Sequence, residues 1–181
     1  KISPYNDSSI EIEKGFFKAY NFVKPQMIEN LGILKNKYKT KDLFITGHSL
    51  GAAMATLMSY DIMTALTEYN IKYFVNFGSP RVGNKEFVES FNSYNISSYR
   101  VTHNYDMVPH LPEEFLGYSH ISNEIWYNEQ NSEYKICDDD KEEDNSCSNS
   151  CAPLYCTSTS DHLYYLNVSM GNDDIDAPLL L

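Results

Sequence analysis

A serine between two glycines, in Gly47-His48-Ser49-Leu50-Gly51, constrains the fold of this chain more than any other feature. The short apolar run before it, Leu43-Phe44-Ile45-Thr46, is typical of a strand buried on both faces of a parallel sheet. The residues after it, from 50 to about 69, begin with small side chains and are predicted to form a helix. Such a serine lies on a sharp, strained turn, where glycines two positions away avoid collisions. We therefore expect a strand, a tight turn that carries Ser49, and a helix.

The segments around this motif alternate between helical and extended patterns. Apolar side chains recur at steps of three and four from residue 11 to about residue 37, which predicts a helix that Pro25 kinks or divides. Strands are expected at residues 71–77 and 97–103, with a helix at residues 84–91 between them. This β-α-β-α-β order predicts parallel strands joined by right-handed crossovers.

The pattern loosens after Pro112. Two edge strands are expected, at residues 121–127 and 133–137, and a short helix is expected at residues 161–168. There is no internal repeat or linker, so residues 1–181 are predicted to form a single domain. Its expected fold class is α/β, with a mostly parallel sheet and helices on both faces.

The charge of the chain argues against some partners. Fourteen Lys and Arg residues against 25 Asp and Glu residues give a net charge of −11. This balance argues against nucleic acid and against adsorption to anionic membranes by charge alone. Many of the acidic side chains lie in residues 138–144, which are expected to form a solvated loop. A calcium loop is disfavoured, because the segment lacks the central glycine of an EF-hand. No apolar run reaches the length of about 18 residues that a transmembrane helix needs.

The cysteines indicate an oxidising compartment. All 4 lie in one polar segment, at Cys137, Cys147, Cys151 and Cys156, and three connectivities are possible. We favour two disulfides over a zinc site, because the spacing is irregular and no histidine is close in sequence. Asn-x-Ser sequons are present at Asn6, Asn95 and Asn167 as possible N-glycosylation sites. Together these features predict a secreted or lumenal protein, with an extracellular location favoured.

A serine hydroxyl becomes a strong nucleophile only when a histidine removes its proton and a carboxylate holds the histidine. On an α/β-hydrolase sheet these residues follow the chain order Ser, acid, His. The first aspartate after the predicted strand at residues 97–103 is Asp106, at the edge where ligands gather in open α/β sheets. Glu113 and Glu114 are alternative acids on a loop bounded by proline.

The general base is predicted to be His162, which precedes the final helix. His120 is the next candidate and is interpreted as a packing histidine within a strand, whereas His110 lies too near Asp106 in sequence. Asp161 is interpreted as the N-terminal cap of the final helix. The backbone N–H of Leu50, one residue after the nucleophile, is the expected oxyanion donor. This chemistry requires no metal and no organic cofactor.

Several segments in the correct order resemble the fungal-type (class 3) lipases of the α/β-hydrolase superfamily. The resemblance covers about residues 12 to 168 and is carried by Thr46-Gly47-His48-Ser49-Leu50-Gly51-Ala52-Ala53, Phe77-Gly78-Ser79-Pro80-Arg81-Val82-Gly83-Asn84, Asp106-Met107-Val108-Pro109-His110-Leu111-Pro112, Tyr118-Ser119-His120, Glu124-Ile125-Trp126-Tyr127 and Ser160-Asp161-His162-Leu163. It implies that Ser49, Asp106 and His162 are nucleophile, acid and base. The implied substrate is a carboxylic ester of a lipid, met at a lipid–water interface.

An α/β-hydrolase also has strands before the nucleophile strand and a loop that gives a second oxyanion donor. The residues before Leu43 show neither, so the chain is expected to be the C-terminal part of a lipase domain that lacks the N-terminal strands. The resemblance favours a triacylglycerol lipase. A phospholipase A1, a feruloyl-type esterase and a non-catalytic module that binds lipid or protein are the alternatives.

Overall fold

The protein contains a five-stranded sheet in the order β1-β2-β3-β4-β5. The computed structural model describes residues 1–138, 143–151 and 155–171. Neighbouring strands from β1 to β4 are parallel, and β5 pairs antiparallel with β4. The predicted mostly parallel sheet is therefore confirmed. The strands are β1 (Asp42–His48), β2 (Asn70–Phe77), β3 (Ser98–His103), β4 (Glu124–Tyr127) and β5 (Tyr134–Ile136).

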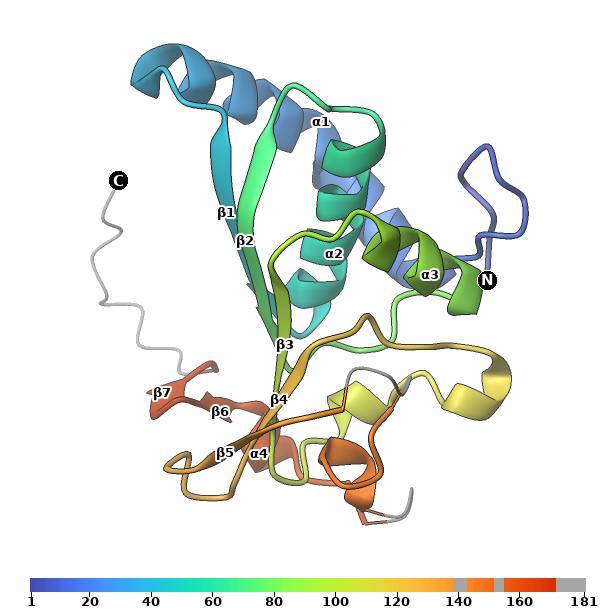
Figure 1. Ribbon diagram of the computed structural model, residues 1–181, viewed down its shortest axis with the longest axis vertical. Coiled ribbons are helices and arrows are strands. Elements are labelled where there is room, and N and C mark those ends of the chain that lie inside the picture. Colours follow the sequence, from blue (N-terminus) through green and yellow to red (C-terminus); the bar gives the residue numbers. More distant parts are fainter. Residues whose placement is uncertain (139–142, 152–154, 172–181) are drawn as a thin grey trace.

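The three long helices lie on one side of this sheet (Figure 1). They are α1 (Lys14–Tyr38), α2 (Leu50–Thr64) and α3 (Lys85–Ser93). The carboxyl end of the other face carries a one-turn helix, α4 (Thr159–His162), followed by a hairpin of β6 (Tyr164–Tyr165) and β7 (Val168–Ser169). Short 3-10 turns complete the described elements: η1 (Val108–His110), η2 (Glu114–Leu116) and η3 (Ser148–Ser150). The long helices of the described residues therefore lie on one face, and a single helical turn lies beside the loops at the carboxyl end of the sheet.

Helix α1 begins where the Glu13 side chain accepts a hydrogen bond from the Phe16 N–H, which satisfies a donor that the first turn leaves unpaired. It continues as 25 residues with Pro25 inside. Of the two alternatives for Pro25, a kink or a division of the helix, the division is therefore wrong. Tyr20, fully buried, donates to Asp61 on α2 and fixes α1 against that helix.

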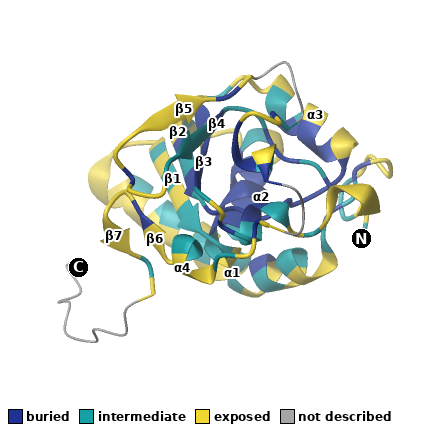
Figure 2. Ribbon diagram, turned by 90° about the horizontal axis from the view of Figure 1, so that it is seen from below, coloured by how far each residue is buried: buried dark blue, intermediate teal, exposed yellow. Residues whose placement is uncertain are grey.

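Helix α2 lies at the centre of the core. Ten of its residues, from Ala52 to Ile62, are buried, and Figure 2 shows the buried residues concentrated along it. A helix that is apolar on nearly all sides is expected to be enclosed by its neighbours, here α1 and the sheet. It ends at Thr64, earlier than predicted. None of the helices in the described ranges combines the length and the apolar character that a membrane crossing requires.

The two faces of β1 and β2 differ in burial. Leu43 and Ile45 pack on the core beneath the helices, and Phe74 of β2 is fully buried there. On the other face the side chain of Phe44 is 74% exposed and stacks on Tyr73, which is 50% exposed. The prediction that this strand is buried on both faces is therefore wrong for the described part of the chain, because β1 is an edge strand there and no helix covers its second face.

Two disulfides, Cys137–Cys147 and Cys151–Cys156, close the polar segment after β5. The structure thereby selects one of the three possible connectivities. Among the described residues, His110 lies near the second disulfide and Glu124 near the first, in groups that resemble metal ligand sets. A cysteine in a disulfide has no thiolate to offer, so the zinc alternative is wrong for this structure.

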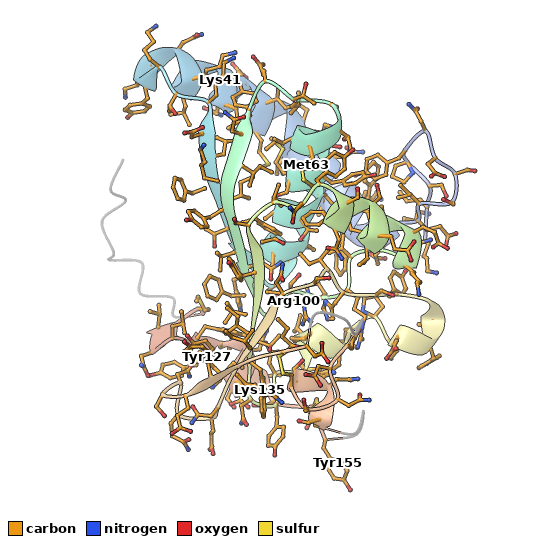
Figure 3. The ribbon with its side chains drawn as sticks, viewed as in Figure 1. Lys41, Met63, Arg100, Tyr127, Lys135 and Tyr155 are labelled. Atoms are coloured by element: carbon orange, nitrogen blue, oxygen red, sulfur yellow. A yellow bond between two sulfur atoms is a disulfide. The ribbon has the colours of Figure 1, made fainter. Side chains whose placement is uncertain are left out.

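Ion pairs and hydrogen bonds hold the disulfide segment on the sheet. Glu143 receives two hydrogen bonds from the Arg81 guanidinium, 2.5 and 2.6 Å long, and both side chains are buried. Lys135 of β5, labelled in Figure 3, donates to the Ser146 carbonyl and hydroxyl. The prediction of a solvated loop at residues 138–144 is therefore wrong for Glu143, whose side chain is buried. Residues 139–142 lie outside the described ranges.

The burial difference between the sheet faces predicts different costs for two phenylalanines. Phe74→Ala should lower the free energy of unfolding by about 3–5 kcal/mol, because it leaves a cavity in the core. The matched change on the exposed face, Phe44→Ala, should cost no more than about 1 kcal/mol. Urea unfolding monitored by circular dichroism measures both. Equal losses in the two variants would contradict this description of the core.

Candidate active site

Ser49 lies on a strained turn between β1 and α2. Its backbone dihedrals are φ 56° and ψ −126°, outside the regions that non-glycine residues ordinarily adopt. The Ser49 N–H donates to the Phe77 carbonyl over 3.1 Å, which ties the turn to the neighbouring strand β2. The turn therefore projects the Ser49 side chain at the carboxyl end of the sheet, as the G-x-S-x-G motif predicted.

The two glycines of the motif are not equivalent. A Cβ atom on Gly47 would lie 2.4 Å from the Gly51 carbonyl oxygen, because strand and helix approach each other closely there. A Cβ atom on Gly51 would meet nothing within 4 Å. The sequence-based interpretation that both positions exclude side chains is correct for Gly47 and wrong for Gly51.

Ser49, His162 and Asp106 are joined by a continuous chain of hydrogen bonds. The Ser49 hydroxyl donates to His162 Nε2 over 2.8 Å, and His162 Nδ1–H donates to Asp106 Oδ2 over 2.9 Å. The Asp106 side chain is 1% exposed and that of His162 is 12% exposed. The structure thus brings together the three residues selected from the sequence, in the arrangement that a nucleophile, a base and an orienting acid require.

Backbone pairing holds the acid and base loops side by side. Ser158 N–H donates to the Tyr105 carbonyl over 3.0 Å, and Met107 N–H donates to the Ser158 carbonyl over 3.3 Å. The Asp161 carboxylate accepts from the Asn104 amide over 2.9 Å and from the Tyr105 N–H over 3.1 Å. Asp161 therefore connects the two loops. The interpretation of Asp161 as the cap of α4 is wrong, because the Ser158 side chain caps that helix.

The alternative bases lie elsewhere. His120 is buried and its Nε2 lies 2.6 Å from the Pro109 carbonyl, and burial shifts its pKa well below the usual value. It precedes β4 and is not within the strand as predicted. His110 lies beside Cys151, and burial lowers its pKa as well. The alternative acids Glu113 and Glu114 line a separate cavity with His110.

His48 contributes a contact that the motif alone did not predict. Its Nε2 lies 2.8 Å from the His162 carbonyl oxygen, and the two imidazole rings lie 4.5 Å apart. Burial lowers the pKa of His48. A neutral ring that carries its proton on Nε2 donates to that carbonyl and restrains the backbone of the candidate base.

Leu50 is the first residue of α2, and its N–H has no partner within that helix, because the first intrahelical hydrogen bonds run from Ala52 and Ala53 to the Ser49 carbonyl. The helix dipole adds a positive partial charge at this end. The N–H therefore has the chemical character of an oxyanion donor beside the Ser49 hydroxyl.

Comparison with known proteins identifies the family. The family model described as "Lipase (class 3)" matches residues 1–116. The chain therefore belongs to the class 3 lipases, with the α/β-hydrolase fold, and the resemblance found in the sequence motifs is confirmed.

Individual relatives agree with this family. The chain is 32% identical to a lipase of Rhizomucor miehei over 91% of its own length and 45% of the relative. It is 34% identical to a secreted mono- and diacylglycerol lipase of Malassezia restricta over 71% of the chain and 41% of that relative. The solved structure of lipase II from Rhizopus niveus superposes with a TM-score of 0.85 and 31% identity, over 94% of this chain and 64% of that one. The chain spans less than half the length of these curated relatives.

The unequal glycines generate a paired prediction. Gly47→Ala should lower the free energy of unfolding by at least about 1–3 kcal/mol, because the new methyl group overlaps the backbone of α2. Gly51→Ala should leave stability unchanged or raise it by up to about 1 kcal/mol, because alanine favours the helix and the space is open. Guanidinium unfolding of both variants provides the comparison. A Gly51→Ala variant less stable than Gly47→Ala would refute the geometry of this turn.

Proposed function

We propose that this chain carries the catalytic triad of a carboxylic ester hydrolase that acts on lipid esters, with Ser49 as nucleophile, His162 as general base and Asp106 as acid. The observation that carries the proposal is the hydrogen-bond chain from Ser49 through His162 to Asp106. Residues 1–181 would form part of a single α/β-hydrolase catalytic domain. One similar solved structure is described as that of a triacylglycerol lipase, and the curated relatives are named as lipases, which supports an activity of the triacylglycerol lipase type.

The proposed reaction is acyl transfer in two steps. Ser49 Oγ attacks the ester carbonyl carbon while His162 Nε2 takes the hydroxyl proton, and Asp106 stabilises the imidazolium that forms. The Leu50 N–H donates to the oxyanion, which collapses as His162 returns the proton to the departing alcohol. Water then attacks the acyl-enzyme with His162 again as base, which releases a carboxylic acid and restores Ser49. No step requires a metal or an organic cofactor.

The alternatives differ in what they require of these residues. A phospholipase A1 or a feruloyl-type esterase would use the same triad on a different ester, and comparison of triacylglycerol, phospholipid and feruloyl substrates separates them. A non-catalytic binding module would have no need of a serine hydroxyl aligned on a histidine. The burial of Asp106 and the strained turn at Ser49 favour an enzyme, because strained backbone and buried acids are retained at catalytic sites.

An extracellular location is proposed on two grounds. Several relatives are named as secreted lipases, and both disulfides suit an oxidising compartment. A lipid–water interface would be where such a protein meets its substrate.

The three sequons predict N-glycosylation in a secretory host. Asn6, Asn95 and Asn167 are all exposed, and the last two have positive φ angles in turns accessible to a glycosyltransferase. Secreted protein should lose mass on treatment with an amidase that removes N-glycans. Peptide mass spectrometry should then find Asn-to-Asp conversion at these positions. Secreted protein with unmodified asparagine at all three would contradict the proposal.

The nucleophile assignment predicts the effect of one substitution. Ser49→Ala should lower the rate of hydrolysis of a short-chain p-nitrophenyl ester by about 10⁴-fold or more, because no other group can form the acyl-enzyme. Ser93→Ala is the matched control, since Ser93 is an exposed serine at the end of α3. Its rate should equal that of the unsubstituted protein. Hydrolysis that persists in Ser49→Ala would eliminate the mechanism.

A further inference from the structure

The proposed mechanism gives no role to Tyr165, a fully buried tyrosine of β6 that contacts the triad. Its hydroxyl donates to Asp106 Oδ2 over 2.5 Å. The same oxygen accepts from His162 Nδ1, and the other carboxylate oxygen accepts from the Val108 N–H over 2.9 Å. Three hydrogen-bond donors therefore hold the Asp106 carboxylate, and one of these donors is His162, the candidate base.

The packing around Gly78 shows how closely these groups converge. Gly78 has φ +53°, and a Cβ atom there would lie 2.9 Å from Asp106 Oδ2, 3.0 Å from His162 Nδ1 and 3.0 Å from the Tyr165 hydroxyl. Only a residue without a side chain leaves room for all three polar groups. The Tyr165 hydroxyl therefore lies directly beside the hydrogen bond between Asp106 and His162.

The ring of Tyr165 is fixed from several sides. Its centroid lies 5.8 Å from that of His48, 5.9 Å from that of Phe77 and 5.6 Å from that of His103, each in an edge-to-face arrangement. Burial, followed by the charge of Asp106, raises the pKa of the Tyr165 hydroxyl well above its usual value. The hydroxyl stays protonated and remains a donor wherever an esterase would operate.

We propose that Tyr165 is a positioning residue, whose hydroxyl holds the Asp106 carboxylate in the rotamer that aims Oδ2 at His162 Nδ1. This role rests on the proposed function, because it concerns the same triad. Tyr165 follows His162 by three residues on the same short segment. One segment of chain therefore supplies both the base and the donor that orients the acid.

Loss of the hydroxyl has two physical consequences. The carboxylate gains freedom to turn, so the imidazole is less often aligned on Ser49 and kcat falls. The negative charge on Oδ2 is also less dispersed, which favours the protonated imidazole and moves the acidic limb of the pH–rate profile to higher pH. The titratable and charged groups that face the acid and base from the surrounding elements are His48, Arg100, His103, His110, Asp161 and Tyr165.

The test compares Tyr165→Phe with Tyr164→Phe. Tyr164 is the neighbouring tyrosine, 41% exposed, and its hydroxyl contacts only Asn167 among the hydrogen bonds of the described residues. With a short-chain p-nitrophenyl ester, Tyr165→Phe should lower kcat about 10-fold, the effect of losing one hydrogen bond to a charged group. KM should change less than about twofold, and the acidic limb should move upward. Tyr164→Phe should change none of these quantities.

Rates are expressed per active site titrated with a p-nitrophenyl phosphonate, so a fraction of unfolded Tyr165→Phe protein does not imitate a catalytic defect. A second readout is the rate of phosphonylation in the Asp106→Asn background, where Tyr165→Phe should have an effect below about twofold because the carboxylate is already gone. An undiminished 10-fold effect in that background would overturn the positioning role.

The failures of the two proposals are distinguishable. A Tyr165→Phe variant with unchanged kcat and an unchanged pH profile overturns the role of Tyr165, while loss of activity in Ser49→Ala continues to support the triad. Activity retained in Ser49→Ala overturns the proposed function, and the role of Tyr165 fails with it.

Discussion

The strained backbone at Ser49 is the constraint on which the rest of the site depends. A positive φ angle at a serine costs on the order of 1–3 kcal/mol, and surrounding contacts must hold it. Those contacts are the close approach of Gly47 to the α2 backbone and the hydrogen bond from Ser49 N–H to the Phe77 carbonyl. Because the parallel strands end together at this edge, the same turn places Ser49 beside the loop that follows β3 and carries Asp106.

His162, the proposed base, comes from a distant part of the sequence, and hydrogen bonds connect its segment to the loops that carry Asp106 and Ser49. Ser158 pairs with the loop that carries Asp106, and Asp161 accepts two hydrogen bonds from residues 104 and 105. His48 restrains the His162 backbone from the nucleophile strand. Ser158 and Asp161 contact residues close to Asp106 in the chain, and His48 contacts His162 itself, so several separate hydrogen bonds together position the imidazole.

Local patterns in the sequence predicted the order of strands and helices, and they selected Ser49, Asp106 and His162, which the structure brings together, because each stands at a fixed place relative to a strand end or a turn. These patterns did not predict the features that depend on tertiary packing, such as the burial of a strand face. An apolar run such as residues 43–46 does not reveal whether a second layer covers it, and Phe44 is exposed. Residues 164–169 form a hairpin where a helix was expected. Tyr165 and His48 carry no motif of their own, and only the folded arrangement places them against the triad.

In the proposed site, His162, oriented by Asp106, activates Ser49. Labelling with a fluorophosphonate, followed by peptide mass spectrometry, tests it most directly, because such probes react with an activated serine and report which one. A single adduct is expected, on Ser49, and it should form far more slowly after His162→Ala. No adduct on native protein, an adduct on another serine, or labelling of Ser49 at an undiminished rate without His162 would contradict it.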